Sequence, residues 1–171
     1  MTLGFSTKWS KKMGELEGKF TFFPERIWLS LPEEIKEERI NYVNKLMDSK
    51  YPFLSVAAKE DLRPKKHTIR KNENKKWKSG TAIHFALFNR TKWRVQFAPV
   101  IPCVSIQSIK IKYKDLDGFT WAVPRVYIDG VWLTDPTELA LNDGFASLED
   151  FFLWFNQDYT GDIIHWTNLK Y

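Results

Sequence analysis

The stretch from Lys65 to Gly80 combines side chains that could do chemistry: several lysines, an arginine and a threonine hydroxyl. Lys65, Thr68 and Arg70 form a K-x-x-T-x-R spacing. In an extended segment, Thr68 and Arg70 point to the same side of the chain, because side chains alternate along a strand. A hydroxyl beside a guanidinium, with a lysine close by, suits a phosphate, a carboxylate or the polar edge of a base. The spacing therefore predicts a site for an anion or a base.

The same stretch has a plainer interpretation, since a run of lysines usually forms a solvated loop. The context favours a site, because Trp77-Lys78-x-Gly80 follows and an alternating apolar segment comes next. Trp77 could instead pack in the core, and His84 could be an ordinary surface histidine. The candidate ligand-binding residues are basic, hydroxyl-bearing or aromatic: Lys65, Lys66, Thr68, Arg70, Lys75, Lys76, Trp77, Lys78 and His84.

The elements that must position these residues are mostly strands. Alternation predicts strands over 81–88, 93–97 and 103–113, and Asp129-Gly130 predicts the tip of a hairpin over 126–133. Helices are expected at 24–28, at 30–48 with Ser30 as part of a capping box, after Asp135, and after Ser147. We expect nine apolar side chains to be largely buried in one core: Ile83, Phe85, Leu87, Val95, Ile109, Ile111, Phe151, Phe152 and Phe155.

Composition narrows the function classes. The 171 residues carry a net charge of +5 with a pI of about 9.2, which favours a polyanionic partner. A single cysteine excludes an internal disulfide, and the three histidines lie too far apart in sequence for a usual metal motif. No apolar run approaches the length of a membrane span. We therefore expect a cytoplasmic protein with no cofactor, no metal and no membrane partner.

Several segments resemble, in the same order, the ASCH-type domains of the PUA-like superfamily, particularly phage and bacterial members. These segments are LGFST, FTFFPERIW, KKHTIR, WKSG, TAIHF, CVSIQSI, NDGFASLEDFFLWF and IIHWTNL, and they cover most of the chain except roughly residues 33–62. The resemblance implies an α+β fold, a mixed or antiparallel PUA-like β-barrel with peripheral helices. It also implies a single domain over 1–171, with a helical elaboration at about 30–48.

The resemblance implies two functions. ASCH and other PUA-like domains generally bind RNA or an unusual base through a cleft with a basic rim, so RNA or a modified nucleotide is the expected partner and DNA an alternative. Small ASCH-type amidohydrolases instead deacetylate N4-acetylcytidine, and by resemblance Thr68 would be the nucleophile and Lys65 its activator. Such an enzyme also needs a glutamate on a later strand, and residues 98–106 contain no carboxylate.

Only Glu60, Asp61 or Glu73 could replace that glutamate from a loop. We therefore favour binding over catalysis. A third hypothesis is a phage protein that binds a host protein in the bacterial cytoplasm.

Overall fold

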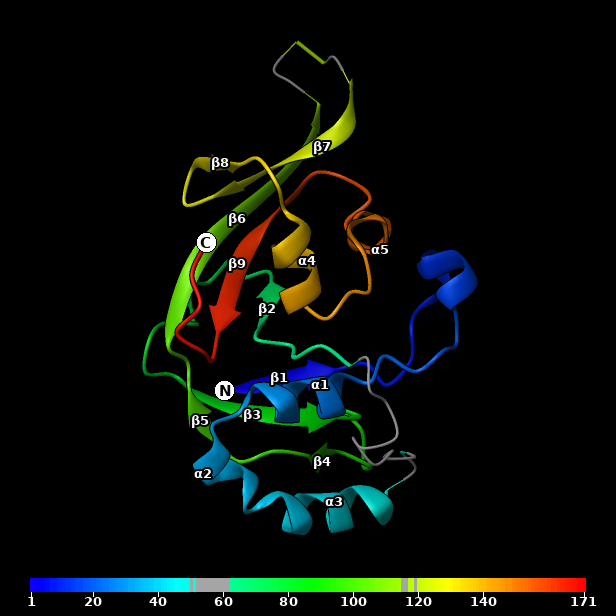
Figure 1. Ribbon diagram of the computed structural model, residues 1–171, viewed down its shortest axis with the longest axis vertical. Coiled ribbons are helices and arrows are strands. Elements are labelled where there is room, and N and C mark those ends of the chain that lie inside the picture. The colour runs from blue at the N-terminus through cyan, green and yellow to red at the C-terminus, as the bar shows by residue number, and fades with distance from the viewer. Residues whose placement is uncertain (50, 52–61, 115–116, 119) are drawn as a thin grey trace. The chain divides into compact units, whose positions relative to one another are not determined.

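The computed structural model describes residues 1–49, 51, 62–114, 117–118 and 120–171. It confirms the α+β class, with strands and short helices along the chain (Figure 1). The described strands form one sheet of four strands and one of five, and their pairings close neither sheet into a barrel. The chain divides into two compact units, residues 1–65 with 81–102 and residues 66–80 with 103–171, and each unit contains one of the sheets.

The first unit is built around strand β3, Ala82–Leu87. β3 pairs in parallel with β1, Thr2–Phe5, and antiparallel with the short strands β4, Val95–Gln96, and β5, Ile101–Pro102. Its alternating apolar pattern predicted this strand, because a period of two places every second side chain on one face. Ile83, Phe85 and Leu87 are fully buried.

The first unit also contains 3₁₀ helix η1, Lys11–Leu16, and helices α1, Phe23–Ser30, α2, Glu33–Lys36, and α3, Arg39–Met47. Helices α1 and α3 lie beside the sheet (Figure 1). Trp28 of α1 connects several of these elements. Its indole N–H donates to the Phe97 carbonyl at 2.9 Å, and its ring centroid lies 5.9 Å from that of Tyr42 on α3. The buried indole thus keeps its one donor satisfied, as a buried tryptophan requires.

The prediction of one continuous helix over 30–48 was wrong. The segment forms two helices, α2 and α3, and the Ser30 hydroxyl caps neither. It donates instead to the carbonyl of Ile27 at 2.7 Å, at the end of α1. Serine readily forms such a local bond to its own helix, and this competes with the capping role that the sequence pattern suggested.

The sheet of the second unit has the strand order β2-β9-β6-β7-β8. All neighbouring pairs are antiparallel. The bounds are β2, His67–Arg70; β6, Ser105–Lys114; β7, Thr120–Ile128; β8, Val131–Leu133; and β9, Tyr159–His165.

Helices α4, Thr137–Asn142, and α5, Leu148–Trp154, lie on one side of this sheet (Figure 1). The predicted cap of α5 is confirmed, since the Ser147 hydroxyl accepts from the Asp150 amide at 3.2 Å. Tyr113 of β6 donates its hydroxyl to the Phe155 carbonyl at 2.6 Å, so α5 covers the face of β6 that carries Tyr113.

Seven of the nine side chains expected in the core are buried, and they divide between the two units. Those on β3 belong to the first unit, whereas Ile109, Ile111, Phe151 and Phe155 belong to the second. The other two, Val95 and Phe152, are half-buried. Each unit therefore has its own group of buried apolar side chains.

The hairpin between β7 and β8 has the predicted turn, with Asp129 at φ 51° and Gly130 at φ 85°. Gly130→Ala should destabilise the protein by about 1 kcal/mol, because only the backbone is strained and no atom lies within 4 Å of the added Cβ. Urea unfolding measures this cost. Val131→Ala, at the exposed neighbouring position, should change stability by much less, and equal losses in both variants would contradict the prediction.

Candidate nucleic-acid interface

The K-x-x-T-x-R motif spans both units of the chain. Thr68 and Arg70 lie on β2, where Thr68 pairs with Ile164 of β9, so the segment has the extended conformation that the interpretation of the motif required. Lys65 belongs to the first unit. Its amide donates to the Arg26 carbonyl at 2.9 Å, and its ammonium nitrogen lies 4.9 Å from the centre of the Phe23 ring. Lys65 and Thr68 are each only 2% exposed, so neither side chain offers a ligand an open surface.

Arg70 is half-buried, and its guanidinium interacts electrostatically with an acidic and a phenolic side chain. Burial lowers the pKa of its guanidinium, while Asp143 and Tyr159 nearby act in the opposite direction. Burial also raises the pKa of the Tyr159 hydroxyl to about 12. Arg70 therefore interacts with groups of its own unit, which limits its freedom to bind a ligand.

A buried polar cluster lies next to Thr68 in the second unit. The Nε2 atom of His67 lies 2.8 Å from the Tyr171 hydroxyl, and its Nδ1 lies 3.7 Å from an Asp143 carboxylate oxygen. The ring of His165 lies 5.3 Å from that of His67, and neither of its nitrogens has a hydrogen-bond partner among the described residues. Burial, aided by Lys170, lowers the pKa of His165 to about 4, although Asp129 acts in the opposite direction.

The other candidate residues differ in exposure. Lys75, Lys76 and Lys78 are exposed in the loop after β2, and Lys66 is half-buried. Trp77 is only 8% exposed, and its amide donates to the Asn72 side chain at 3.2 Å, which agrees with the core-packing alternative. His84 is half-buried in the first unit, with its Nδ1 atom 3.4 Å from the Gln96 side-chain oxygen.

The carboxylate that an amidohydrolase would need is still unassigned. Glu60 and Asp61 lie outside the described residues. Glu73 is exposed and lies 3.8 Å from Lys71. Sequence reasoning overlooked Glu25, which is fully buried in the first unit and accepts a hydrogen bond from the Tyr51 hydroxyl at 2.8 Å. The resemblance places the catalytic glutamate on a strand near residues 98–106, far from Glu25 in the sequence. Nothing in the sequence therefore marked Glu25 as a candidate.

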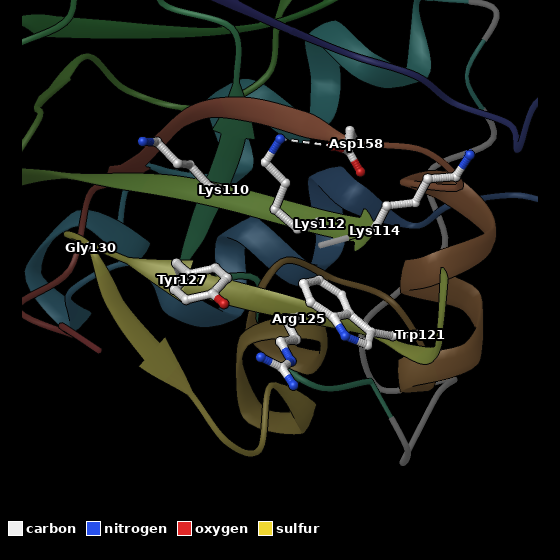
Figure 2. A pocket seen from close by; sticks show the side chains of 8 residues that line it. All are labelled: Lys110, Lys112, Lys114, Trp121, Arg125, Tyr127, Gly130 and Asp158. Atoms are coloured by element: carbon white, nitrogen blue, oxygen red, sulfur yellow. Dashed lines mark hydrogen bonds and ion pairs between the residues drawn. The ribbon is translucent and has the colours of Figure 1, made fainter. Parts of the chain in front are cut away.

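A second basic surface lies on the five-stranded sheet. Figure 2 shows Lys110, Lys112 and Lys114 along β6, with Tyr127, Arg125 and Trp121 along the neighbouring strand β7. Together with Gly130 and Asp158, these side chains line a pocket of about 470 Å³. We call this surface the lysine face. The three lysines alternate with Ile109, Ile111 and Tyr113, so they project from the side of β6 opposite the helix α5.

The charges of the lysine face are poorly balanced. Among the described residues, four cationic side chains and one carboxylate line the pocket. That carboxylate, Asp158, pairs with Lys112 at 2.8 Å. Lys112 and Arg125 are directly opposite each other across β6 and β7, and like charges in such a cross-strand pair are destabilising.

Arg125 is held by aromatic rings and has no ion pair among the described residues. Its guanidinium carbon lies 4.2 Å from the centre of the Trp121 ring and 5.3 Å from that of Trp132 on β8. The planar cation therefore rests against the indoles, a contact that is worth about 0.5–1 kcal/mol at an exposed position.

Sequence analysis identified the alternation on β6 but missed the aromatic half of this surface. Thr120–Arg125 was not predicted as strand, because Pro124 interrupts the segment and Val123 and Arg125 give no buried alternation. Proline is tolerated at positions where a strand does not need its N–H group. The available signal was a tryptophan and an arginine spaced by four residues, directly before the predicted hairpin.

The described part of the chain contains no group of three metal-ligating side chains that could hold an ion. Within the same residues, no helix combines the length and the apolar character that crossing a bilayer requires. Comparisons with protein-family models, with curated proteins and with solved structures found no match for this chain. The resemblance to ASCH-type domains therefore stays a prediction.

Proposed function

We propose that this protein binds nucleic acid through the lysine face of its second unit. The observation that carries the proposal is the pocket itself, in which the described residues place four cations from two adjacent strands beside two aromatic rings and one carboxylate. Lysine and arginine side chains bind phosphates, and nearby aromatic side chains can contact bases. RNA and DNA share this chemistry, and the resemblance to ASCH-type domains favours RNA.

A solubility role explains the lysine face less well. Lysines often protect the exposed edges of sheets from pairing with other chains. This role does not account for Lys110, because β7 and β9 both pair with β6 at that residue. Lys112 and Lys114 lie beyond the end of the β6–β9 pairing. A cross-strand pair of like charges such as Lys112 and Arg125 costs stability in the free protein. An anionic ligand would offset this repulsion.

The exposed lysines after β2 provide a possible extension of the same interface. Lys75, Lys76 and Lys78 belong to the same unit as the lysine face. Contacts of this kind with phosphates add affinity without sequence information. Membership of the PUA-like superfamily remains part of the proposal, supported by the α+β class and by the resemblance of the segments. A cytoplasmic location remains part of it on the resemblance to phage and bacterial members.

Binding of a fluorescein-labelled U12 RNA and a dT12 DNA should depend steeply on salt. Each phosphate contact to a single strand contributes about 0.7 to the slope of log K against log salt, because binding releases counterions. Changing Lys110, Lys112 and Lys114 together to alanine should weaken binding on the order of tenfold or more at low salt, and should flatten the slope by about 2. Fluorescence anisotropy between 25 and 200 mM KCl measures both quantities.

The control variant changes Lys19, Lys45 and Lys92 to alanine, which removes the same charge from exposed positions of the first unit. It should keep most of the affinity and the slope. A third variant, with Lys75, Lys76 and Lys78 changed to alanine, measures the contribution of the loop. The proposal fails if the wild-type protein binds neither oligonucleotide, or if the lysine-face variant behaves like the control.

A further inference from the structure

The aromatic rings of the lysine face hold Arg125, and they could also contact a base, which phosphate binding alone does not require. Trp121 and Tyr127 are half-buried pocket-lining residues, and Trp132 is 52% exposed on the adjacent strand β8. Tyr127 is directly opposite Trp132 in the β7–β8 pairing and opposite Lys110 in the β6–β7 pairing. Aromatic rings therefore lie next to the cations on one face of three neighbouring strands.

Arg125 marks the position on this face where a flat group can stack. Its guanidinium carbon is 4.2 Å from the centre of the Trp121 ring, a distance typical of stacking contact. Among the described residues, Arg125 has no ion-pair partner and contacts the rings of Trp121 and Trp132. A planar group already occupies this indole face in the free protein, and a nucleobase has a similar flat shape and a larger π-surface.

We propose that Trp121 is a stacking platform for an unpaired nucleobase, and that Arg125 leaves the indole to contact the adjoining phosphate when the base binds. This inference rests on the proposed function and narrows its ligand to single-stranded nucleic acid with intact bases. Figure 2 shows Lys110, Lys112 and Lys114 along β6 and Trp121 on β7. In the proposed complex the lysines contact the phosphates of the strand, and the base lies on β7. A duplex hides the faces of its bases in the stack, so it has no base to offer Trp121.

An abasic oligonucleotide separates stacking from charge. A dT12 strand and a tetrahydrofuran abasic 12-mer carry the same phosphates, but only dT12 carries bases. Wild-type protein should bind dT12 more tightly than the abasic strand, by roughly 5- to 150-fold if one base stacks on Trp121. Trp121→Ala should reduce this ratio toward one by weakening dT12 binding alone. Trp121→Phe keeps an aromatic face and should retain most of the ratio.

Arg125→Ala provides a second, independent measurement. It removes one cation, so both strands should bind more weakly. It also uncovers the indole, so the ratio of dT12 to abasic affinity should stay the same or rise. Arg125→Ala would lower the ratio if Arg125 itself, rather than Trp121, were the surface on which the base stacks. Thermal unfolding curves that match the wild type for all variants exclude loss of the fold as the cause of any change in affinity.

The outcomes separate the two proposals. Equal binding of dT12 and the abasic strand by the wild-type protein would overturn the stacking inference and leave the nucleic-acid proposal intact. Parallel losses for both strands in Trp121→Ala would also overturn it, because Trp121 would then only support the lysine face. Binding of neither strand would overturn both proposals. A preference for a 12-base-pair duplex over dT12 would contradict the inference alone.

Discussion

Replacing Phe151 with alanine should destabilise the protein by about 3–5 kcal/mol, the usual cost of removing a large buried aromatic side chain. Phe151 is fully buried on α5. Its ring centroid lies 4.9 Å from that of Phe155, 5.4 Å from Phe152 and 5.5 Å from Phe145. Truncation would remove apolar surface from contact with these rings and leave a cavity that they could refill only in part.

The control for this prediction is Leu153→Ala. Leu153 lies on the same helix but is 45% exposed, so its truncation should cost well below 1.5 kcal/mol. Urea denaturation followed by circular dichroism gives both values. A loss of less than about 1.5 kcal/mol for Phe151→Ala would mean that the aromatic cluster of the second unit does not form a tightly packed core.

Lowering the pH from 7 to 4 should destabilise the protein by roughly 3 kcal/mol through His165 alone, taking about 1.4 kcal/mol for each tenfold change in proton affinity. Burial lowers the pKa of His165 from 6.5 to about 4. The unfolded chain therefore takes up a proton at a higher pH than the folded protein does. The stabilisation is complete above about pH 6.5, declines between pH 6.5 and 4, and changes little further below pH 4.

The groups around His165 set the controls for this experiment. His67 and Tyr171 pack against its ring, while Lys170 and Asp129 act on its charge. His165→Phe removes the titrating group and keeps a ring, so its stability should decline less between pH 6.5 and 4 than that of the wild type. Chemical denaturation of both proteins at a series of pH values gives the difference between their free energies of unfolding. The contributions of the carboxylates cancel in this difference. If the free energy of unfolding fell equally steeply with pH in the two proteins, a group other than His165 would be responsible for the loss of stability.

Much of the local structure could be predicted because its causes are local. The alternation of Ile83, Phe85 and Leu87 specified β3, since only an extended chain places all three on one face. Asp129-Gly130 specified the hairpin turn, because both residues take positive φ there. Ser147 specified the start of α5, because its hydroxyl satisfies an otherwise unpaired amide of the first turn.

The candidate site was predicted less well, because burial and pairing depend on residues distant in sequence. The K-x-x-T-x-R spacing predicted a site for an anion or a base, yet Thr68 is buried and Lys65 belongs to the other unit. The alternation of lysines with isoleucines on β6 indicated a solvated face in the sequence. Only the structure showed that β7 brings Arg125 and Trp121 next to those lysines.

The sequence by itself determined the basic character, the central strands and the turn at Asp129-Gly130, because each depends on composition or on side chains a few residues apart. The α+β class was expected from the resemblance to ASCH-type domains, and the structure confirms it. The tertiary structure alone decided which strands are neighbours and therefore which charges and rings meet. The order β2-β9-β6-β7-β8 joins segments separated by many residues. Long-range burial selects such pairings, and no local period in the sequence encodes them.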